Sequence, residues 1–233
     1  TGKLQEEAVR RSSLLRFFPP SVVGPLMGSA DFGSQVRDAD VTVLFSDISG
    51  FTAMSSKLAP REVVDLLNRY FPVMAEIVFR HEGTLEKYIG DALMAIWGVP
   101  TPHEDDADRA LSAALEMRSA LARLNATWGA DRRLEIHVGL NSGPVACGNI
   151  GSPDYVQFAA IGDTTNVSAR VCTAAQEGEV LISEETRRRL KTSRFSLEAL
   201  PPVTVKGKAE PLHLHRARWA PADETVGVER LPL

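Results

Sequence analysis

The sequence predicts an α+β fold in which helices pack against one mainly antiparallel sheet. Short apolar runs rich in β-branched residues, such as residues 41–45, are typical of buried strands. Residues 85–97 contain two such runs around Gly90 and Asp91, a pair that favours a tight turn and therefore a hairpin. Longer segments between the strands repeat apolar residues every three or four positions, as amphipathic helices do.

The first strand leads directly to Asp47. Ser49, Gly50 and Thr52 follow, and such small residues let backbone N–H groups turn together toward a polyanion. A carboxylate that can hold a divalent cation is therefore expected beside a loop that can hold phosphate.

The hairpin supplies a second carboxylate. If its strands lie beside the first strand, Asp91 and Asp47 reach the same edge of the sheet. Two converging carboxylates repel each other, and a bound cation removes the repulsion. Mg²⁺ prefers one or two carboxylates together with phosphate oxygens, so a phosphoryl-transfer site is expected here.

Two amphipathic helices are predicted to form the core. Pro60 begins the first one, and Pro72 is expected to kink it. Its apolar stripe consists of Val63, Leu67, Tyr70, Met74 and Ile77. The second helix covers residues 104–126, and its inner face consists of Ala107, Leu111, Leu115 and Leu121.

The run of His103, Glu104, Asp105 and Asp106 has the composition of a metal site. It also stands where the second helix begins, and acidic side chains complement the positive end of a helix. We interpret the run as a helix start.

Residues 134–140 and 145–150 flank the sequence Asn-Ser-Gly-Pro and are interpreted as a hairpin. Residues 155–161 predict a further strand. A helix should follow, with Asp163 or Thr164 as its cap. The glycines at 143, 148 and 151 do not form a dinucleotide-binding fingerprint.

Asn166 and Arg170 are four residues apart on that helix and leave from one face. Val167 and Val171 point into the core. An Arg facing a triphosphate stabilises charge at the α-phosphorus, and an amide can orient the ribose. The alternative is a pair of ordinary solvated side chains.

The remaining chain predicts strands at residues 179–183, 203–205 and 212–216 and a helix at residues 184–190. Lys206 lies in a Lys-Gly-Lys loop that could reach a phosphate or form a solvated turn. We expect a coupling segment at residues 1–37, a catalytic domain at residues 38–218 and a disordered tail at residues 219–233.

Composition excludes several classes. The net charge is −4, whereas nucleic-acid binders usually carry a basic field. No apolar run approaches the about 18 residues that span a membrane. The two cysteines suit neither a metal site nor a disulfide framework, which favours a reducing cytosol. Because the chain begins with Thr1, we expect it to be a piece of a longer protein, with a tag or processing scar as the alternative.

Three segments together resemble the catalytic domain of class III nucleotidyl cyclases, the adenylyl and guanylyl cyclases. They are FSDISGFT, EKYIGDALMAIWG and IGDTTNVSARV, and the resemblance runs from residue 41 to residue 185. It implies a ferredoxin-like core, a homodimer with active sites at the subunit interface, and two Mg²⁺ or Mn²⁺ ions per site. The domain would lie in the cytoplasm, and the full-length protein could be anchored in a membrane.

The resemblance also implies roles for single residues. Asp47, Asp91 and the carbonyl of Ile48 would hold the metals on one subunit. Lys87, Asn166 and Arg170 would come from the other subunit. The phosphates would lie on Ile48, Ser49, Gly50, Phe51, Thr52 and Lys206. The reaction implied is attack of the ribose 3′-oxygen on the α-phosphorus, with release of pyrophosphate.

Base choice departs from the family pattern. Lys87 favours ATP because an ammonium donates to adenine N1 and clashes with the N1–H of guanine. The second recognition position, seven residues before Asn166, is Ala159 and has no hydrogen-bonding side chain. We therefore expect ATP as the substrate, weakened discrimination by about 1 kcal/mol or more, and some use of GTP.

Other readings stay open at this stage. A guanylyl or dual-specificity cyclase and a nucleotide-binding pseudocyclase are alternatives, although both Asp and the Asn/Arg pair are present. A diguanylate cyclase would need a Gly-Gly-Asp/Glu-Glu-Phe run, which the hairpin lacks. The sequence does not show the upstream domain, the activating signal, including bicarbonate, or the preferred metal.

Overall fold

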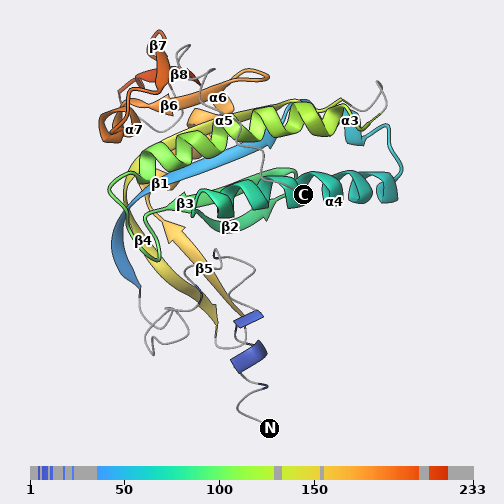
Figure 1. The fold of residues 1–233 in the computed structure, drawn as a ribbon, viewed down its shortest axis with the longest axis horizontal. Helices are drawn as coiled ribbons and strands as arrows, with labels where there is room; N and C mark the ends of the chain where they lie inside the picture. The colour runs from blue at the N-terminus through green and yellow to red at the C-terminus, as the bar shows by residue number, and fades with distance from the viewer. Residues whose placement is uncertain are drawn as a thin grey trace, which may run out of the picture.

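The computed structural model describes residues 36–128, 133–152, 155–204 and 210–219, together with the single positions 5, 7–9, 11–12, 18 and 23. These residues form one eight-stranded sheet with helices on both faces (Figure 1). The expected coupling segment and tail lie almost wholly outside the described residues, and so does Lys206. The domain boundaries stay predictions.

The sheet is mainly antiparallel, as the sequence predicted. Its strands are β1 (Arg37–Ile48), β2 (Thr84–Ile89), β3 (Ala92–Trp97), β4 (Ile136–Ser152), β5 (Tyr155–Ile161), β6 (Val180–Ser183), β7 (Phe195–Ala199) and β8 (Leu214–Trp219). Their order is β2-β3-β1-β4-β6-β8-β7, and β5 pairs with β4. Among these pairs only β4 and β6 run parallel. β1 therefore lies between the hairpin β2–β3 and the long strand β4.

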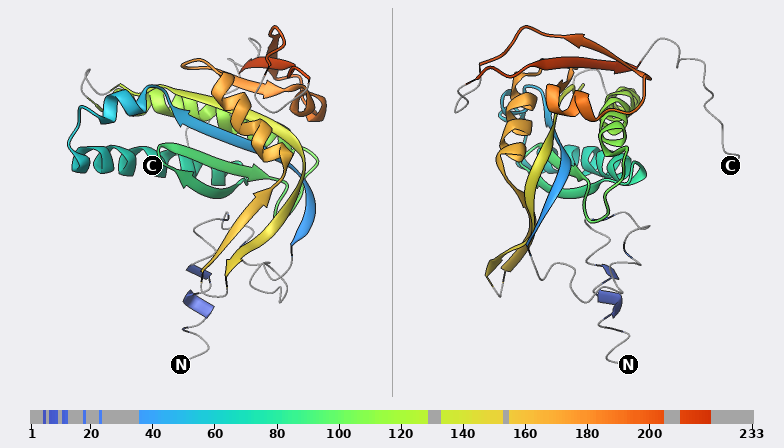
Figure 2. Two further views of the ribbon diagram at one scale, coloured as in Figure 1. Left: turned by 180° about the vertical axis from the view of Figure 1, so that it is seen from behind. Right: turned by 90° about the vertical axis from the view of Figure 1, so that its left-hand side faces the viewer.

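Two layers of helix enclose the sheet. The helices are α3 (Phe51–Ser55), α4 (Pro60–Arg80), α5 (Asp106–Asn125), α6 (Asp163–Ala174) and α7 (Glu184–Arg189). Figure 2 shows α4 and α5 on one face and α6 on the other. No helix in the described part of the chain combines the length and apolar character needed to cross a bilayer.

The main core lies between the sheet and the pair α4 and α5, as predicted. Tyr70, Met74 and Ile77 are buried on α4, Leu67 is half-buried against the core, and Leu66, which was not predicted, is buried as well. Adjacent residues on a helix are about 100° apart, so a wide apolar stripe includes both. All four residues predicted for the inner face of α5 are buried. α4 continues through Pro72, and the expected kink stays a prediction.

The prediction of a hairpin at residues 134–150 is wrong. These residues belong to the single strand β4, which pairs with β1 from Ile136 to Cys147. On the other side of β4, β6 pairs with residues 138–140 and β5 with residues 146–152. Proline has no N–H to donate, and Pro144 lies between the stretches of β4 that pair with β6 and β5. On that side of β4 no strand is therefore left without a hydrogen-bond donor. The long pairing with β1 outweighs the local turn preference.

The residues predicted to form the turn instead hold the start of α6. Asn141 Nδ2 donates to the Thr164 carbonyl at 3.0 Å, and Thr164 Oγ1 donates to the Pro144 carbonyl at 2.7 Å. The N-cap of α6 is Gly162, without a side-chain cap, so the expected cap at Asp163 or Thr164 is wrong. Thr164 instead uses its hydroxyl to join α6 to β4.

The C-terminal part also differs in detail. β7 was not predicted, and the last strand begins at Leu214 instead of residue 212. Val203 forms an isolated bridge with Leu212. β7 is short and mostly exposed, so it lacks the apolar run that identifies a buried strand.

The acidic run before α5 acts as a helix start, as interpreted. Asp106 Oδ2 accepts a hydrogen bond from the His103 backbone N–H at 2.8 Å, and Asp105 pairs with Arg109 one turn later. Within the described residues, no group of three or more His, Cys, Asp or Glu side chains is arranged to hold a metal ion. Both cysteines are free and buried.

The contact between α6 and β4 depends on Gly139. A Cβ at this position would overlap the backbone nitrogen of Cys172 on α6. We predict that Gly139→Ala lowers the free energy of unfolding by about 3 kcal/mol, because the helix must move away from the sheet. Gly162→Ala is the control, since its Cβ would lie 3.2 Å from the nearest atom. Urea unfolding measures both, and an equal small loss for the two variants would contradict this packing.

Candidate active site

Asp47 and Asp91 lie together, as the sequence predicted. Ser46 of β1 pairs with Leu93 of β3, which brings the end of β1 beside the hairpin turn. Gly90 forms that turn with a left-handed φ of 64°. Burial first, and then a side-chain hydrogen bond with Asp47 and the charge of Asp47, raise the pKa of Asp91 to about 6. The two carboxyl groups therefore form a strained pair that a cation would relieve.

Ser46, Tyr70 and Cys172 are buried next to the carboxylates. Tyr70 is fully buried there, and its hydroxyl lies 3.5 Å from Ser46 Oγ. Burial, followed by the charge of Asp47, raises the pKa of the Cys172 thiol to about 12. Because these buried residues exclude water, the charges of the Asp47 and Asp91 carboxylates are poorly screened on this side.

His137 joins the site and was not predicted. It stands opposite Asp47 in the β1–β4 register. Its Nδ1 lies 3.0 Å from Ser49 Oγ, and its Nε2 lies 3.7 Å from Asp47 Oδ2. Burial lowers the pKa of His137, although the charge of Asp91 opposes this shift. A neutral ring thus links the loop to the carboxylate.

The loop after β1, predicted to bind phosphate, turns at Gly50, and its anion-binding role stays a prediction. Gly50 adopts a left-handed φ of 68°, and a Cβ there would meet no atom within 4 Å. The Ser49 N–H is held by the Glu135 carbonyl at 2.9 Å, while α3 begins at Phe51. The first N–H groups of a helix have no partner inside it. The first N–H groups of α3 therefore have no partner within that helix, and the space beside Gly50 is open.

The donor set fits Mg²⁺ or Mn²⁺. Asp47, Asp91 and the Ile48 carbonyl offer only oxygen atoms, which these hard cations prefer. Two carboxylates leave coordination positions for water and phosphate oxygens, in keeping with the way Mg²⁺ binds. Burial and the nearby charge of Asp47 raise the pKa of Asp91, so a bound cation would stabilise the ionised pair.

α6 presents the predicted polar pair. Asn166 is exposed and Arg170 is half-buried, whereas Val167 and Val171 are buried as expected. Ser168 Oγ fixes the helix by donating to the Val43 carbonyl at 2.7 Å. Arg170 Nη1 is buried and meets no hydrogen-bond acceptor among the described residues. Buried guanidinium nitrogens are normally paired, so this one is suited to an incoming anion.

Lys87 and Ala159 lie on β2 and β5, which approach each other although they are far apart in strand order. The Lys87 side chain is 30% exposed, and its Nζ lies 3.1 Å from Glu86 Oε1. Ala159 is buried, at 9% exposure. The two strands that carry the positions predicted to recognise the base therefore contact each other.

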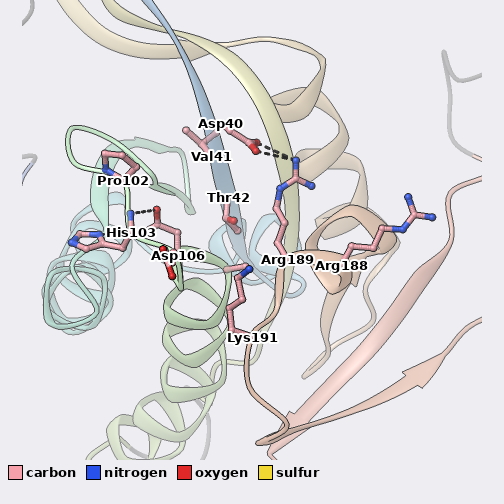
Figure 3. A pocket seen from close by; sticks show the side chains of 11 residues that line it. Asp40, Val41, Thr42, Pro102, His103, Asp106, Arg188, Arg189 and Lys191 are labelled. Carbon is pink, nitrogen blue, oxygen red and sulfur yellow. Dashed lines mark hydrogen bonds and ion pairs between the residues drawn. The ribbon is translucent and has the colours of Figure 1, made fainter.

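A hollow of about 320 Å³ lies elsewhere, at the other end of β1 (Figure 3). It is lined by Asp40, His103 and Arg189, among others. Figure 3 shows Arg189 bonded to Asp40, and the distances are 3.1 and 3.2 Å. None of the predicted site residues lines this hollow, so it is separate from the candidate site.

The chain matches the family model described as "Adenylate and Guanylate cyclase catalytic domain" over residues 34–215. This match covers most of the chain, and the chain therefore belongs to that family. The resemblance carried by the three sequence motifs is confirmed.

Curated relatives include both kinds of cyclase. Adenylate cyclase 1 of Rhizobium meliloti (strain 1021) is 32% identical over 158 residues, which are 66% of this chain and 24% of that protein. The adenylate cyclase of Anabaena cylindrica is 32% identical over 188 residues, 76% of this chain and 36% of that protein. The receptor-type guanylate cyclase gcy-23 of Caenorhabditis elegans is 31% identical over 214 residues, 89% of this chain and 20% of that protein. The chain thus spans about a third or less of these relatives.

Solved structures agree with this fold. The adenylyl cyclase CyaB from P. aeruginosa superimposes with a TM-score of 0.77 at 32% identity, covering 80% of this chain and 97% of that chain. The guanylyl cyclase Cya2 gives a TM-score of 0.74 at 32% identity, covering 78% and 93%. The predicted fold class is confirmed. Adenylate and guanylate cyclases are about equally similar, so these similarities do not decide the base.

The shared proton of the carboxylate pair predicts a pH dependence of metal binding. Asp91 is largely protonated below its pKa of about 6, and a metal must displace that proton. The dissociation constant for Mn²⁺, measured by electron paramagnetic resonance, should rise about tenfold for each pH unit below 6 and stay level above it. Asp91→Asn should remove this slope, and His137→Gln should retain it. An unchanged slope in Asp91→Asn would contradict the assignment.

Proposed function

We propose that this domain is an adenylyl cyclase that converts ATP to 3′,5′-cyclic AMP and pyrophosphate. The observation that carries the proposal is the Asp47 and Asp91 pair beside an open loop, in a chain of the cyclase family. The unpaired nitrogen of Arg170 supports it, because a triphosphate would supply the missing acceptor.

The metals would be held by Asp47, Asp91 and the Ile48 carbonyl, and they would lower the pKa of the 3′-hydroxyl and neutralise the departing pyrophosphate. The N–H groups of Gly50, Phe51 and Thr52 bind the β- and γ-phosphates. Lys206, which lies outside the described residues, would reach the same phosphates.

The other polar residues act on the reacting centre. The bond from the 3′-oxygen to the α-phosphorus forms while the bond from that phosphorus to the bridging oxygen breaks, and the hydroxyl proton leaves to solvent. Arg170 balances the negative charge on the α-phosphoryl oxygens, and Asn166 orients the ribose. Catalysis rests on position and charge, so no covalent nucleophile is needed.

The active form is proposed to be a homodimer with two shared sites. Asp47 and Asp91 act from one subunit, and Lys87, Asn166 and Arg170 act from its partner. Exposed apolar side chains on β2, β4 and β5 support a partner surface: they are Tyr88, Ile89, Ile150 and Ile161, between 38% and 55% exposed. Without a second copy, each site would lack half of its residues.

The proposed compartment is the cytoplasm, where ATP is abundant and thiols stay reduced. The free, buried Cys147 and Cys172 are compatible with it. The product would serve as a soluble signal, and no nucleic acid or membrane surface is required for the reaction.

Base choice should favour ATP without excluding GTP. Lys87 donates to adenine N1, but Ala159 offers no second hydrogen bond. The specific observation that favours a dual-specificity enzyme is therefore this alanine, and it makes a guanylyl activity the second candidate.

The first prediction concerns products. The purified chain is incubated with Mg²⁺ or Mn²⁺ and with ATP or GTP, and cyclic nucleotides are separated by chromatography. Cyclic AMP should predominate over a detectable amount of cyclic GMP, and Ala159→Thr should raise the preference for ATP about fivefold to tenfold. A GTP rate equal to or above the ATP rate would reject the base assignment. No cyclic product from a verified dimer would indicate a pseudocyclase.

The second prediction concerns the shared sites. Asp47→Ala and Arg170→Ala should each be inactive as homodimers, because both of their sites lose an essential group. Mixing them by unfolding and refolding should restore about a quarter of the wild-type activity, since half of the dimers are mixed and each has one intact site.

A mixture of Asp47→Ala with Asp91→Ala is the control and should stay inactive, because both changes damage the same half of each site. If Asp47 and Arg170 act within one chain, the first mixture will be inactive as well. That outcome would reject the arrangement across the interface while leaving the carboxylate pair untouched.

A further inference from the structure

Glu86 is a buried acidic residue without a role in the mechanism described above. It is 2% exposed, although it lies beside Lys87 on β2. Its Oε1 lies 3.1 Å from Lys87 Nζ. Its Oε2 is buried and meets no hydrogen-bond donor among the described residues. Acidic side chains are rarely buried to this extent, and rarely with one oxygen unpaired.

A bulge in β2 explains how Glu86 and Lys87 come together. The β2–β3 register passes from Leu85 opposite Ala95 to Lys87 opposite Met94, so Glu86 is the extra residue. Successive side chains of a regular strand point to opposite faces, and a bulge suspends this alternation. The carboxylate and the ammonium can therefore meet despite being neighbours in sequence.

The position of the carboxylate connects it with the base-recognition residues. Burial raises the pKa of Glu86, while Lys87 and the backbone of Ala160 act in the opposite direction. Ala160 is the neighbour of Ala159 on β5. Glu86 thus contacts Lys87 on β2 and lies near the backbone of Ala160 on β5.

The ligand chemistry follows from the hydrogen-bonding pattern of the purine edge. Adenine presents an acceptor at N1 and a donor at its exocyclic amine. Lys87 supplies a donor, and the unpaired oxygen of Glu86 is an acceptor. A buried acceptor left without a donor is costly, so a ligand that supplies the donor is favoured over one that does not.

We propose that Glu86 is a specificity-determining residue that accepts a hydrogen bond from the exocyclic amine of the purine substrate. This inference rests on the proposed cyclase function. Glu86 makes this contact from β2, while position 159 on β5 stays without a hydrogen-bonding side chain, and Glu86 also holds the Lys87 ammonium toward N1.

The test compares ATP with purine riboside 5′-triphosphate, which keeps the N1 acceptor and lacks the exocyclic amine. Wild-type protein should prefer ATP about tenfold or more in kcat/KM. Glu86→Met removes the acceptor, and its preference should fall to within about twofold of unity. Glu86→Gln is the matched control, because its amide oxygen still accepts, and it should retain the wild-type preference.

A merely structural role gives a different result. If Glu86 only supports Lys87 or the sheet, Glu86→Met will lower the rates with both nucleotides by the same factor, and the unchanged ratio overturns the proposal. A wild-type ratio near unity overturns it as well, whether or not the Met variant folds. Where Glu86→Met does not form the wild-type oligomer, Glu86→Asp, which shortens the side chain by one methylene, replaces it.

Binding separates this inference from the proposed function. Displacement of a fluorescent ATP analogue by the two nucleotides gives the same preference without turnover. The protein could form no cyclic product and still bind ATP with a tenfold preference that Glu86→Met abolishes. That result would reject the cyclase function and keep the base-recognition role of Glu86. Normal turnover with a ratio unaffected by Glu86→Met would reject only the role of Glu86.

Discussion

The repulsion between the Asp47 and Asp91 carboxylates is the interaction on which the functional architecture depends. Burial of Asp91, followed by its hydrogen bond with Asp47 and the charge of Asp47, raises the pKa of Asp91 to about 6. Such an arrangement lowers the stability of the domain alone and becomes favourable when a cation binds. The neighbouring loop adds N–H groups that can bind an anion. A metal ion would neutralise the carboxylates, and the phosphates of a nucleotide would bind both the metal ion and the loop.

The sheet maintains this strained pair because β1 is fixed on both sides. β3 holds it through the hairpin that carries Asp91, and β4 pairs with its whole length. α6 is fixed to β1 and β4 because the Ser168 hydroxyl bonds to both strands and the helix backbone approaches Gly139 closely. Rigid placement of α6 in turn fixes Arg170, whose buried nitrogen faces no acceptor in the described part of the chain. The positions of Asp47, Asn166 and Arg170 thus follow from regular secondary structure, whereas Asp91 and Gly50 lie in turns next to it.

The local sequence predicted the parts of the site that local rules determine. Asp47 follows an apolar strand and Asp91 follows a turn glycine, so their positions needed only the pairing of one hairpin with one strand. β4 was misread because Asn-Ser-Gly-Pro is strong turn chemistry, and its outcome depended on pairing with residues about 100 positions away. His137 and Glu86 were missed for a related reason. The first becomes visible only in the β1–β4 register, and the second only through a bulge. Registers and bulges are set by tertiary packing, which a single sequence does not display.

The most direct test of the central claim is an anomalous-difference map. Crystals are grown with Mn²⁺ and with an ATP analogue that lacks the 3′-hydroxyl, so that no cyclisation occurs. The account predicts two Mn²⁺ peaks about 3.5–4 Å apart between Asp47 and Asp91, with the triphosphate on the loop at Gly50 and the guanidinium of Arg170 of the partner subunit at the α-phosphate. Absence of metal from the carboxylate pair, with nucleotide bound elsewhere, would contradict it.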